Sequence, residues 1–411
     1  MISNETIGTK NIHRPLIVFG EDWGVHPSST QHIIKILSQT RSIIWVNSIG
    51  LRKPKLTFND IFRLFNKFKF FIFNQQKHNK TNQSEVIYSQ NKFIIINPLV
   101  IPCANNWLSL KLSKFILKWQ IKLASNKLII KNPIIWSSLP TSVDYLTLFC
   151  SAPCVYYCGD DFESLAGVDH NFVSKKEKEL VAKSSYIFTA SKEMINKFPP
   201  HKTVNIPHGV DFSLFSQKIN YKPTDLPKGK PIAGFYGSIS NWLDQDLLVQ
   251  AIKALPHWNF VFIGKVNCKI DKLQQFSNVF FLGAKNHTEL PLYIKNWNVA
   301  MLPFLNNKQI QMCNPLKLRE YIASGTPVVT TDFNAVQDYR KFVQIVDQRT
   351  SLYKAILLAS AEITPSVNFE NLHLISDLST ITKVKNFRQT LVVKESWERR
   401  AMDIQRYLFM C

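Results

Sequence analysis

Short apolar runs alternate with polar segments of helical periodicity along most of the chain. Each run is rich in β-branched and aromatic residues and is bounded by turn-forming residues, which favours a buried strand. In the N-terminal half these runs are Pro15–Gly20, Ser42–Asn47, Lys92–Asn97, Pro133–Ser137, Pro153–Gly159 and Ser185–Ser191. In the C-terminal half they are Ile232–Tyr236, Phe260–Gly264, Val279–Leu282, Val299–Pro303 and Val328–Thr331. Strands that alternate with helices predict an α/β protein with doubly wound parallel sheets.

The two halves of the chain open with the same arrangement of strand, glycine-containing loop and helix. Between them, the segment Asn220–Pro231 contains three prolines and no apolar periodicity, as an interdomain linker does. The chain has 411 residues, enough for two domains with separate cores. We therefore predict two Rossmann-like domains, residues 1–219 and 232–383, a linker over 220–231, and a C-terminal helix over 384–411.

The segment from Asn314 to Thr331 reads NPLKLREYIASGTPVVTT and has the signals of a helix followed by a buried strand. Asn314 is a suitable N-cap, and Pro315 at the first helical position loses no hydrogen bond. Gly325 can adopt the left-handed backbone conformation that ends a helix, and Pro327 prevents the helix from continuing.

Within this helix Lys317, Glu320 and Tyr321 share one side, because residues three and four apart are neighbours on a helix. A helix N-terminus favours an anion, and a carboxylate one turn later can accept two hydrogen bonds from a ribose diol. This pattern indicates a site for a nucleotide diphosphate. The alternative is an ordinary surface ion pair between Lys317 and Glu320, and the spacing alone leaves both open.

The amino-acid sequence of this segment closely resembles the donor-binding segment of GT-B glycosyltransferases of the glycosyltransferase 4, or group 1, type. The resemblance implies two Rossmann-like domains that face a cleft, with Glu320 on the ribose of a nucleotide-sugar. It also implies that Cys313 to Leu316, including Asn314 and Pro315, face the diphosphate. Many members carry a second glutamate eight residues before this one, and Met312 stands there in this chain.

Members of that family also offer an arginine and a lysine in the loop after the first strand of the second domain. Here the loop reads GSISNW and has no basic residue. Phosphate contacts are therefore expected from backbone N–H groups near Gly237 and Ser238, or from Lys265, Lys308 or Lys317.

Two candidate catalytic residues lie in the N-terminal domain. Asp160, followed by Asp161, comes directly after the strand Pro153–Gly159, and the resembling family has a similar aspartate pair. A carboxylate at that edge can bind or deprotonate a sugar hydroxyl, although a helix N-cap is the alternative. His26 lies in the loop after the first strand and either contacts substrate or serves the loop itself.

The formal charge of +21 is concentrated in one region. Between Arg52 and Lys131, fifteen Lys or Arg stand against Asp60 and Glu85, a net charge of +13. Two segments there pattern as basic amphipathic helices, and in the second the apolar residues interleaved with lysines are Leu108, Leu112, Phe115, Trp119 and Leu123. The alternatives are a solvated face over a core helix, docking on an anionic membrane surface, and nucleic-acid binding, for which no motif is present.

Other features limit the class of protein. The seven cysteines favour reduced thiols over a disulfide framework, and the spacing of Cys150, Cys154 and Cys158 lacks a fourth metal ligand, so we expect no metal site. We see no signal peptide and no apolar run of transmembrane length. We therefore expect a protein of the cytoplasm, or one peripheral to the inner face of the plasma membrane.

Together these observations predict a glycosyltransferase of the hexosyltransferase class. The resemblance implies a nucleotide-diphosphate sugar as donor substrate, no further cofactor, and retention of anomeric configuration. We expect a saccharide or lipid-linked acceptor, in bacterial surface polysaccharide synthesis, with no nucleic acid as partner. Two alternatives stay open: a non-catalytic GT-B scaffold that binds a nucleotide, and a nucleotide-sugar epimerase, against which Met312 argues.

Overall fold

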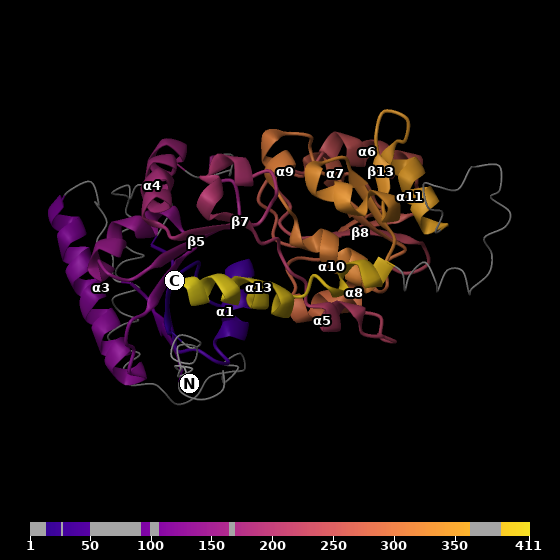
Figure 1. Ribbon diagram of the computed structural model, residues 1–411. Coiled ribbons are helices and arrows are strands. Elements are labelled where there is room, and N and C mark those ends of the chain that lie inside the picture. The colour runs from indigo at the N-terminus through magenta and orange to yellow at the C-terminus, as the bar shows by residue number, and fades with distance from the viewer. Residues whose placement is uncertain (1–13, 26–27, 50–91, 99–106, 164–168, 362–387) are drawn as a thin grey trace, which may run out of the picture. The chain divides into compact units, whose positions relative to one another are not determined.

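The computed structural model describes residues 14–25, 28–49, 92–98, 107–163, 169–361 and 388–411. The chain forms two compact units (Figure 1). Unit 1 comprises Met1–Pro207 with Ala401–Cys411, and unit 2 comprises His208–Arg400. The C-terminal helix α13 (Trp397–Met410) therefore begins in unit 2 and ends in unit 1.

Unit 1 is built on a seven-stranded sheet in which every described pairing is parallel, in the order β3-β2-β1-β4-β5-β6-β7. Its strands are near-continuous apolar runs because helices cover both faces of such a sheet. Trp45, Trp136 and Tyr156 are fully buried in it. The strands are β1 (Leu16–Phe19), β2 (Ile43–Val46), β3 (Phe93–Ile96), β4 (Ile134–Ser137), β5 (Cys154–Cys158), β6 (Tyr186–Thr189) and β7 (Thr203–Asn205).

Two helices of unit 1, α1 (Ser29–Leu37) and α4 (His170–Lys183), begin at side-chain N-caps. The Ser28 side chain accepts from the Gln31 backbone N–H and caps the first helix, and Asp169 caps α4 through the Phe172 N–H. Near the end of α13, Tyr407 makes edge contacts with Tyr186 and Phe188 of β6. The other described elements are α3 (Trp107–Leu128) and the 3-10 segments η1 (Pro140–Phe149), η2 (Ile195–Lys197) and η3 (Pro200–Lys202).

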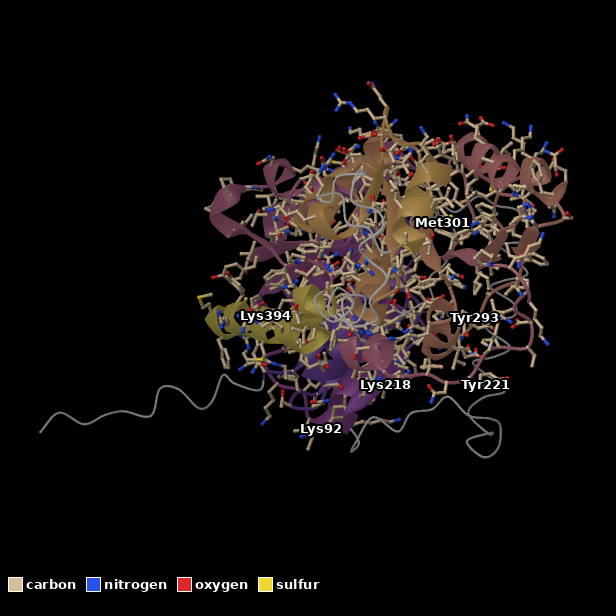
Figure 2. The ribbon with its side chains drawn as sticks, turned by 90° about the vertical axis from the view of Figure 1, so that its right-hand side faces the viewer. Lys92, Lys218, Tyr221, Tyr293, Met301 and Lys394 are labelled. Atoms are coloured by element: carbon tan, nitrogen blue, oxygen red, sulfur yellow. The ribbon has the colours of Figure 1, made fainter. Side chains whose placement is uncertain are left out.

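Unit 2 is built on a six-stranded sheet of parallel pairings in the order β10-β9-β8-β11-β12-β13. The strand order reverses between β8 and β11, which is where open α/β sheets bind ligands. Met301 of β11 is fully buried in this core, whereas Tyr221 is 58% exposed (Figure 2). The strands are β8 (Ile232–Tyr236), β9 (Asn259–Ile263), β10 (Val279–Phe281), β11 (Val299–Leu302), β12 (Val328–Thr331) and β13 (Gln344–Val346).

The helices of unit 2 from α5 to α11 are short, and most of them lie in the crossover connections that parallel strands need. They are α5 (Phe212–Ser216), α6 (Gln245–Ala254), α7 (Asp271–Gln274), α8 (Leu290–Ile294), α9 (Lys308–Met312), α10 (Leu316–Ser324) and α11 (Leu352–Ser360), with the 3-10 segments η4 (His287–Glu289) and η5 (Asn334–Phe342). The predicted α/β class with two doubly wound sheets is confirmed.

The division between the units differs from the predicted boundary at residue 219. It lies between Pro207 and His208, because Phe215 is fully buried in the core of unit 2 and Val210 forms a bridge with Ser396. The expected linker, residues 220–231, is part of unit 2. Leu226 within it is 2% exposed and packs in the same core.

In the described part of the chain, no helix is both long enough and apolar enough to cross a bilayer. Among the same residues, no group of three His, Cys, Asp or Glu side chains has the geometry of a metal site. Cys154 and Cys158 are buried at the two ends of β5, and Cys150 is exposed.

Candidate functional site

The helix α10 begins one residue later than its sequence pattern predicts. It starts at Leu316, and Pro315 is the N-cap, with φ of −68° and ψ of 126°. The side chain of Asn314, the residue before this N-cap, accepts through Oδ1 from Arg319 Nη1 at 2.6 Å. Arg319 is buried, and it reaches both Asn314 and the Glu395 carboxylate. The predicted stop is confirmed, since Gly325 has φ of 75° at the C-cap.

Lys317, in the first turn of α10, lies where the strand order reverses. Its Nζ is 5.7 Å from the ring centroid of Phe235 in β8 and 5.8 Å from that of Phe304 after β11. Its side chain passes over Gly237, where an added Cβ would lie 2.5 Å from Lys317 Cε. Gly237 also has φ of +131°, which a residue with a side chain rarely adopts. The lysine is thus held over the carboxyl end of β8.

The loops after β8 and β9 are joined closely beside this lysine. The Gly237 N–H donates to the Ile263 carbonyl, and a Cβ at Gly264 would lie 1.9 Å from the Gly237 carbonyl oxygen. Asn267 Nδ2 donates to Ser238 Oγ at 2.6 Å. Lys265 is exposed in the second of these loops. The structure therefore brings Gly237, Ser238, Lys265 and Lys317 to one edge of the sheet.

Glu320, one turn further along α10, is 8% exposed and held from two directions. Its Oε1 lies 2.7 Å from His287 Nε2, and its Oε2 accepts from the Tyr236 hydroxyl at 2.5 Å. The His287 ring in turn packs edge-on against the ring of Phe215, with 5.4 Å between the ring centroids. A carboxylate has about four acceptor positions, so Glu320 keeps capacity for further donors.

The charges at this site favour an ionised pair of Glu320 and His287. Burial acts to raise the pKa of Glu320, but the hydrogen bond and charge of His287, the Tyr236 hydroxyl and the charge of Lys317 together lower it. Burial acts to lower the pKa of His287, but its hydrogen bond to Glu320 and the charges of Glu320 and Asp211 together raise it. The imidazolium and the carboxylate therefore stabilise each other.

Tyr321 is a core residue and does not line the site with Lys317 and Glu320. It is fully buried, and its hydroxyl accepts from the Tyr236 backbone N–H at 3.0 Å. Conversely, the sequence interpretation missed Tyr236 and His287. Tyr236 ends an apolar strand, so the sequence pattern predicts a core residue there. His287 has no local sequence signal, because its contact with Glu320 spans 33 residues.

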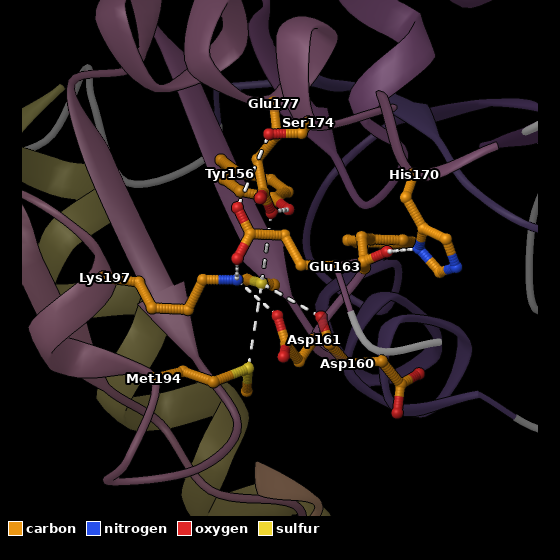
Figure 3. Close-up of polar contacts among 11 residues, drawn as sticks. Tyr156, Asp160, Asp161, Glu163, His170, Ser174, Glu177, Met194 and Lys197 are labelled. Carbon is orange, nitrogen blue, oxygen red and sulfur yellow. Dashed lines mark hydrogen bonds and ion pairs between the residues drawn. The ribbon is translucent and has the colours of Figure 1, made fainter. Parts of the chain in front are cut away.

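In unit 1 the aspartate pair after β5 is divided between two environments. Asp161 is 7% exposed and forms an ion pair with Lys197, whose Nζ also lies 3.4 Å from Glu163 Oε2. Asp160 is exposed, and its carboxylate points away from the Lys197 group (Figure 3). The N-cap of α4 is Asp169, so the alternative role as a cap of that helix does not fall to Asp160.

A second buried carboxylate near this pair is Glu177 of α4, which is 4% exposed and feels the charge of Asp161. Its Oε1 accepts from the Tyr156 hydroxyl at 2.6 Å, and the Cys158 thiol lies 3.7 Å away (Figure 3). Burial raises the pKa of Glu177 despite the hydrogen bond from Tyr156 and the charge of Lys197, both of which lower it. The other candidate of unit 1, His26, lies outside the described residues.

Comparisons with known proteins show what the chain is similar to. Residues 216–341, which include β8, the Gly237 loop and α10, match the model of the family "Glycosyl transferases group 1". Among curated proteins, the chain is 23% identical over 228 residues to "Putative teichuronic acid biosynthesis glycosyltransferase TuaH" of Bacillus subtilis (strain 168). That match covers 50% of this chain and 57% of the relative, so the chain spans little more than half of the relative's length.

Solved structures resemble nearly the whole chain. Sucrose-phosphate synthase from Thermosynechococcus elongatus has a TM-score of 0.63 at 15% identity, covering 96% of this chain and 98% of that one. Anabaena Alr3699/HepE, solved in complex with UDP and glucose, has a TM-score of 0.63 at 12% identity, covering 97% of this chain and 100% of that one. An alpha,alpha-trehalose-phosphate synthase (UDP-forming) from Burkholderia vietnamiensis has a TM-score of 0.60 at 12% identity, with the same coverage of 97% and 100% of the two chains.

The fold is therefore that of the GT-B glycosyltransferases, and the resemblance predicted from the sequence is confirmed. Within that fold, unit 2 carries the segment that matches the group 1 glycosyl transferases. Both findings support the predicted enzyme class, a glycosyltransferase.

Proposed function

We propose that the chain transfers a sugar from a nucleotide-diphosphate donor to a saccharide or lipid-linked saccharide acceptor. The observation that carries this proposal is the pair of Lys317 and Glu320, one turn apart on α10. Lys317 lies against Gly237 at the reversal of strand order, and Glu320 Oε1 lies 2.7 Å from His287 Nε2. A cation and a carboxylate at this separation match a diphosphate and the ribose next to it.

Each part of the donor has a proposed partner in unit 2. Lys317, together with Lys265 and the backbone N–H groups around Ser238, binds the diphosphate. Glu320 accepts hydrogen bonds from the ribose hydroxyls, while His287 and Tyr236 fix its orientation. The helix start from Asn314 to Leu316 faces the phosphates. The solved relatives that contain UDP or UDP-glucose make a uridine nucleotide the first one to test.

The proposed chemistry is the departure of the nucleoside diphosphate from the sugar carbon and attack by an acceptor hydroxyl. Positive charge at Lys317 stabilises the leaving diphosphate as its negative charge develops. In unit 1, Asp160 is the proposed contact for the acceptor, since its exposed carboxylate can accept a hydroxyl proton or hydrogen bond. We further propose retention of the anomeric configuration, which proton NMR of the product tests directly.

The proposed setting is the synthesis of a bacterial surface polysaccharide, on the cytoplasmic side of the plasma membrane. It rests on the match to the B. subtilis relative, whose name refers to teichuronic acid biosynthesis. The acceptor would then be a growing saccharide or its lipid-linked precursor.

Calorimetric titration with UDP, GDP, ADP and CMP tests the donor site. We expect the native chain to bind one of them preferentially. Glu320→Gln should weaken the binding of that nucleotide about 10- to 100-fold, because hydrogen bonds to an ionised group contribute about 1.5–3 kcal/mol. Glu398→Gln, which removes an exposed carboxylate of α13, is the matched control and should bind as the native chain does. Absence of binding to all four nucleotides, or equal affinity in Glu320→Gln, would contradict the proposal.

A non-catalytic nucleotide-binding scaffold is the second candidate. Met312 favours it, because this last residue of α9 stands where many of the resembling enzymes carry a glutamate. Release of free nucleoside diphosphate from the donor sugar separates the two functions. An enzyme releases it in proportion to added acceptor, whereas a scaffold binds the nucleotide without any release.

A further inference from the structure

The long helix α3 (Trp107–Leu128) has two apolar faces, of which one packs in unit 1 (Figure 1). Its inner face contacts β2, β3 and η1. The residues buried on that face are small or aliphatic: Ser113, Leu117, Ile121 and Ala124. Their spacing of four, four and three residues is that of a single helical face. The fold therefore accounts for one apolar side of this helix.

The opposite side carries a second apolar row, here called the outer stripe and defined as Leu108, Leu112, Phe115, Trp119 and Leu123. These residues are four, three, four and four apart, so they also share one face. Phe115 is 69% exposed and Trp119 is 51% exposed, and the other three lie between 44% and 55%. Single exposed apolar residues are common, but a continuous row of large ones marks an interaction surface. This stripe is the face singled out in the sequence, and the structure does not bury it in the core.

The charges of α3 restrict the chemistry of its partner. The helix contains Lys111, Lys114, Lys118, Lys122 and Lys127 and no acidic residue. On a helical projection Lys111, Lys118 and Lys122 fall beside the outer stripe, between it and the inner face. Long lysine side chains can extend past an apolar surface toward anions at its border. The partner is therefore apolar in its interior and anionic at its surface.

We propose that the outer stripe of α3 docks on a bilayer surface that contains anionic lipids. Phe115, Trp119 and the leucines enter the boundary between headgroups and acyl chains, and the lysines contact lipid phosphates. A helix of 22 residues is about 33 Å long, enough to lie in the interface plane along its whole stripe. A second copy of the chain fits less well, because face-to-face stripes would bring lysines of like charge together. Nucleic acid would leave the leucines and aromatic rings in water.

Vesicle co-sedimentation of the full chain tests this docking without any nucleotide, so its result does not depend on the donor site. We expect binding to vesicles of phosphatidylcholine with phosphatidylglycerol and much weaker binding to phosphatidylcholine alone. Added salt should weaken binding to the anionic vesicles, because exposed charges are screened. No sedimentation with anionic vesicles at low salt would overturn the proposal.

Charge reversal examines the lysines beside the stripe. Lys111→Glu combined with Lys118→Glu and Lys122→Glu should weaken binding at least 100-fold, because each lysine near an anionic surface contributes about fivefold. The matched control is Lys228→Glu with Lys253→Glu and Lys269→Glu, which makes the same change of net charge on exposed lysines of unit 2. Equal loss in both triple variants would show attraction by total charge rather than docking through α3, and would overturn the proposal.

Removal of the aromatic side chains examines the apolar contact. Phe115→Ser with Trp119→Ser should weaken vesicle binding at least tenfold for each ring removed, with the melting temperature unchanged. A fall of several degrees in the melting temperature would instead mean that another part of the chain covers the stripe. Loss of a concentration-dependent dimer in sedimentation velocity, with vesicle binding intact, would assign the stripe to a second copy. Either result contradicts docking on lipid.

Discussion

A tyrosine hydroxyl donates to a buried glutamate in both units of the molecule, but the pKa values of the two glutamates are shifted in opposite directions. In unit 1, Tyr156 of β5 donates to Glu177 of α4, and burial raises the pKa of that glutamate. In unit 2, Tyr236 of β8 donates to Glu320 of α10, whose pKa is lowered. A hydrogen bond from a strand tyrosine to a helix glutamate therefore occurs in both units, and the groups around each carboxylate determine the direction of its pKa shift.

The cations beside each glutamate explain this difference. Lys197 is paired with Asp161 and Glu163, and the negative charges of these two carboxylates raise the pKa of Glu177 while the charge of Lys197 lowers it. Glu320 instead receives a direct contact from His287, with Lys317 nearby. A buried carboxylate with its own cation remains ionised and can accept from a ligand, whereas one without it mainly supports the fold.

The largest expected effect comes from exchanging each lysine for methionine. Lys317→Met should lower kcat/KM about 100- to 1,000-fold, because it removes a charge that stabilises the leaving diphosphate. Lys197→Met should instead lower the free energy of unfolding by about 3 kcal/mol, because it leaves the buried Asp161 carboxylate without its cation. Steady-state kinetics and chemical denaturation of both variants measure these effects. An equal loss of activity per folded molecule would contradict the assignment of different roles.

The two glutamates themselves sharpen the comparison. Glu320→Gln should weaken nucleotide binding about 10- to 100-fold, whereas Glu177→Gln should leave the affinity within about twofold of the native chain. Glutamine keeps an acceptor for the tyrosine hydroxyl in each case, so both variants are expected to fold. Calorimetric titration measures the affinities, and equal effects would mean that Glu320 is as structural as Glu177.

Removing the tyrosine hydroxyls should give smaller effects that again divide between the units. Tyr156→Phe should cost about 1 kcal/mol of unfolding free energy with nucleotide affinity unchanged. Tyr236→Phe should have a similar cost and also weaken nucleotide binding about fivefold, since Glu320 loses one of its two orienting contacts. If Tyr236→Phe changed stability alone, the hydroxyl would have no part in holding Glu320 for a ligand.

The smallest effects concern pH. His287 has a pKa raised above its ordinary value of 6.5, so its pairing with Glu320 is complete below about pH 6.5 and is lost as pH rises through the raised value. Glu177 has a pKa raised above 4.5, so its ionisation costs stability progressively as pH rises past that point. Thermal unfolding should therefore show a decline toward alkaline pH that His287→Gln reduces in the upper part and Glu177→Gln in the lower part. Curves that stay parallel to the native one would contradict both assignments.

The sequence predicted the elements of the site better than its contacts. Strands such as Ile232–Tyr236 and the helix that ends at Gly325 follow from local apolar patterns and turn chemistry. The spacing of Lys317 and Glu320 likewise indicated a diphosphate and a ribose. The partners of Glu320 could not be predicted, because the contact with Tyr236 spans 84 residues and depends on how the strands are ordered.

The errors have equally local causes. Asn314 was predicted as the N-cap, but the helix begins one residue later, with Pro315 at the N-cap. Tyr321 follows Glu320 by one residue and therefore points about 100° away around the helix, into the core. For α3, the sequence contains two apolar faces, and only the packing of Leu117 and Ile121 shows which one is inside. The contribution of His26 stays a prediction.

The most direct test of the donor site is phosphorus NMR of UDP titrated with the native chain and with Lys317→Met. The account predicts that both phosphate resonances shift on binding to the native chain, and that the shift is lost or much reduced in Lys317→Met. The same perturbation should persist in Glu320→Gln at saturating UDP, because that variant changes the ribose contact alone. Identical phosphate shifts in the native chain and Lys317→Met would contradict the placement of the diphosphate at α10.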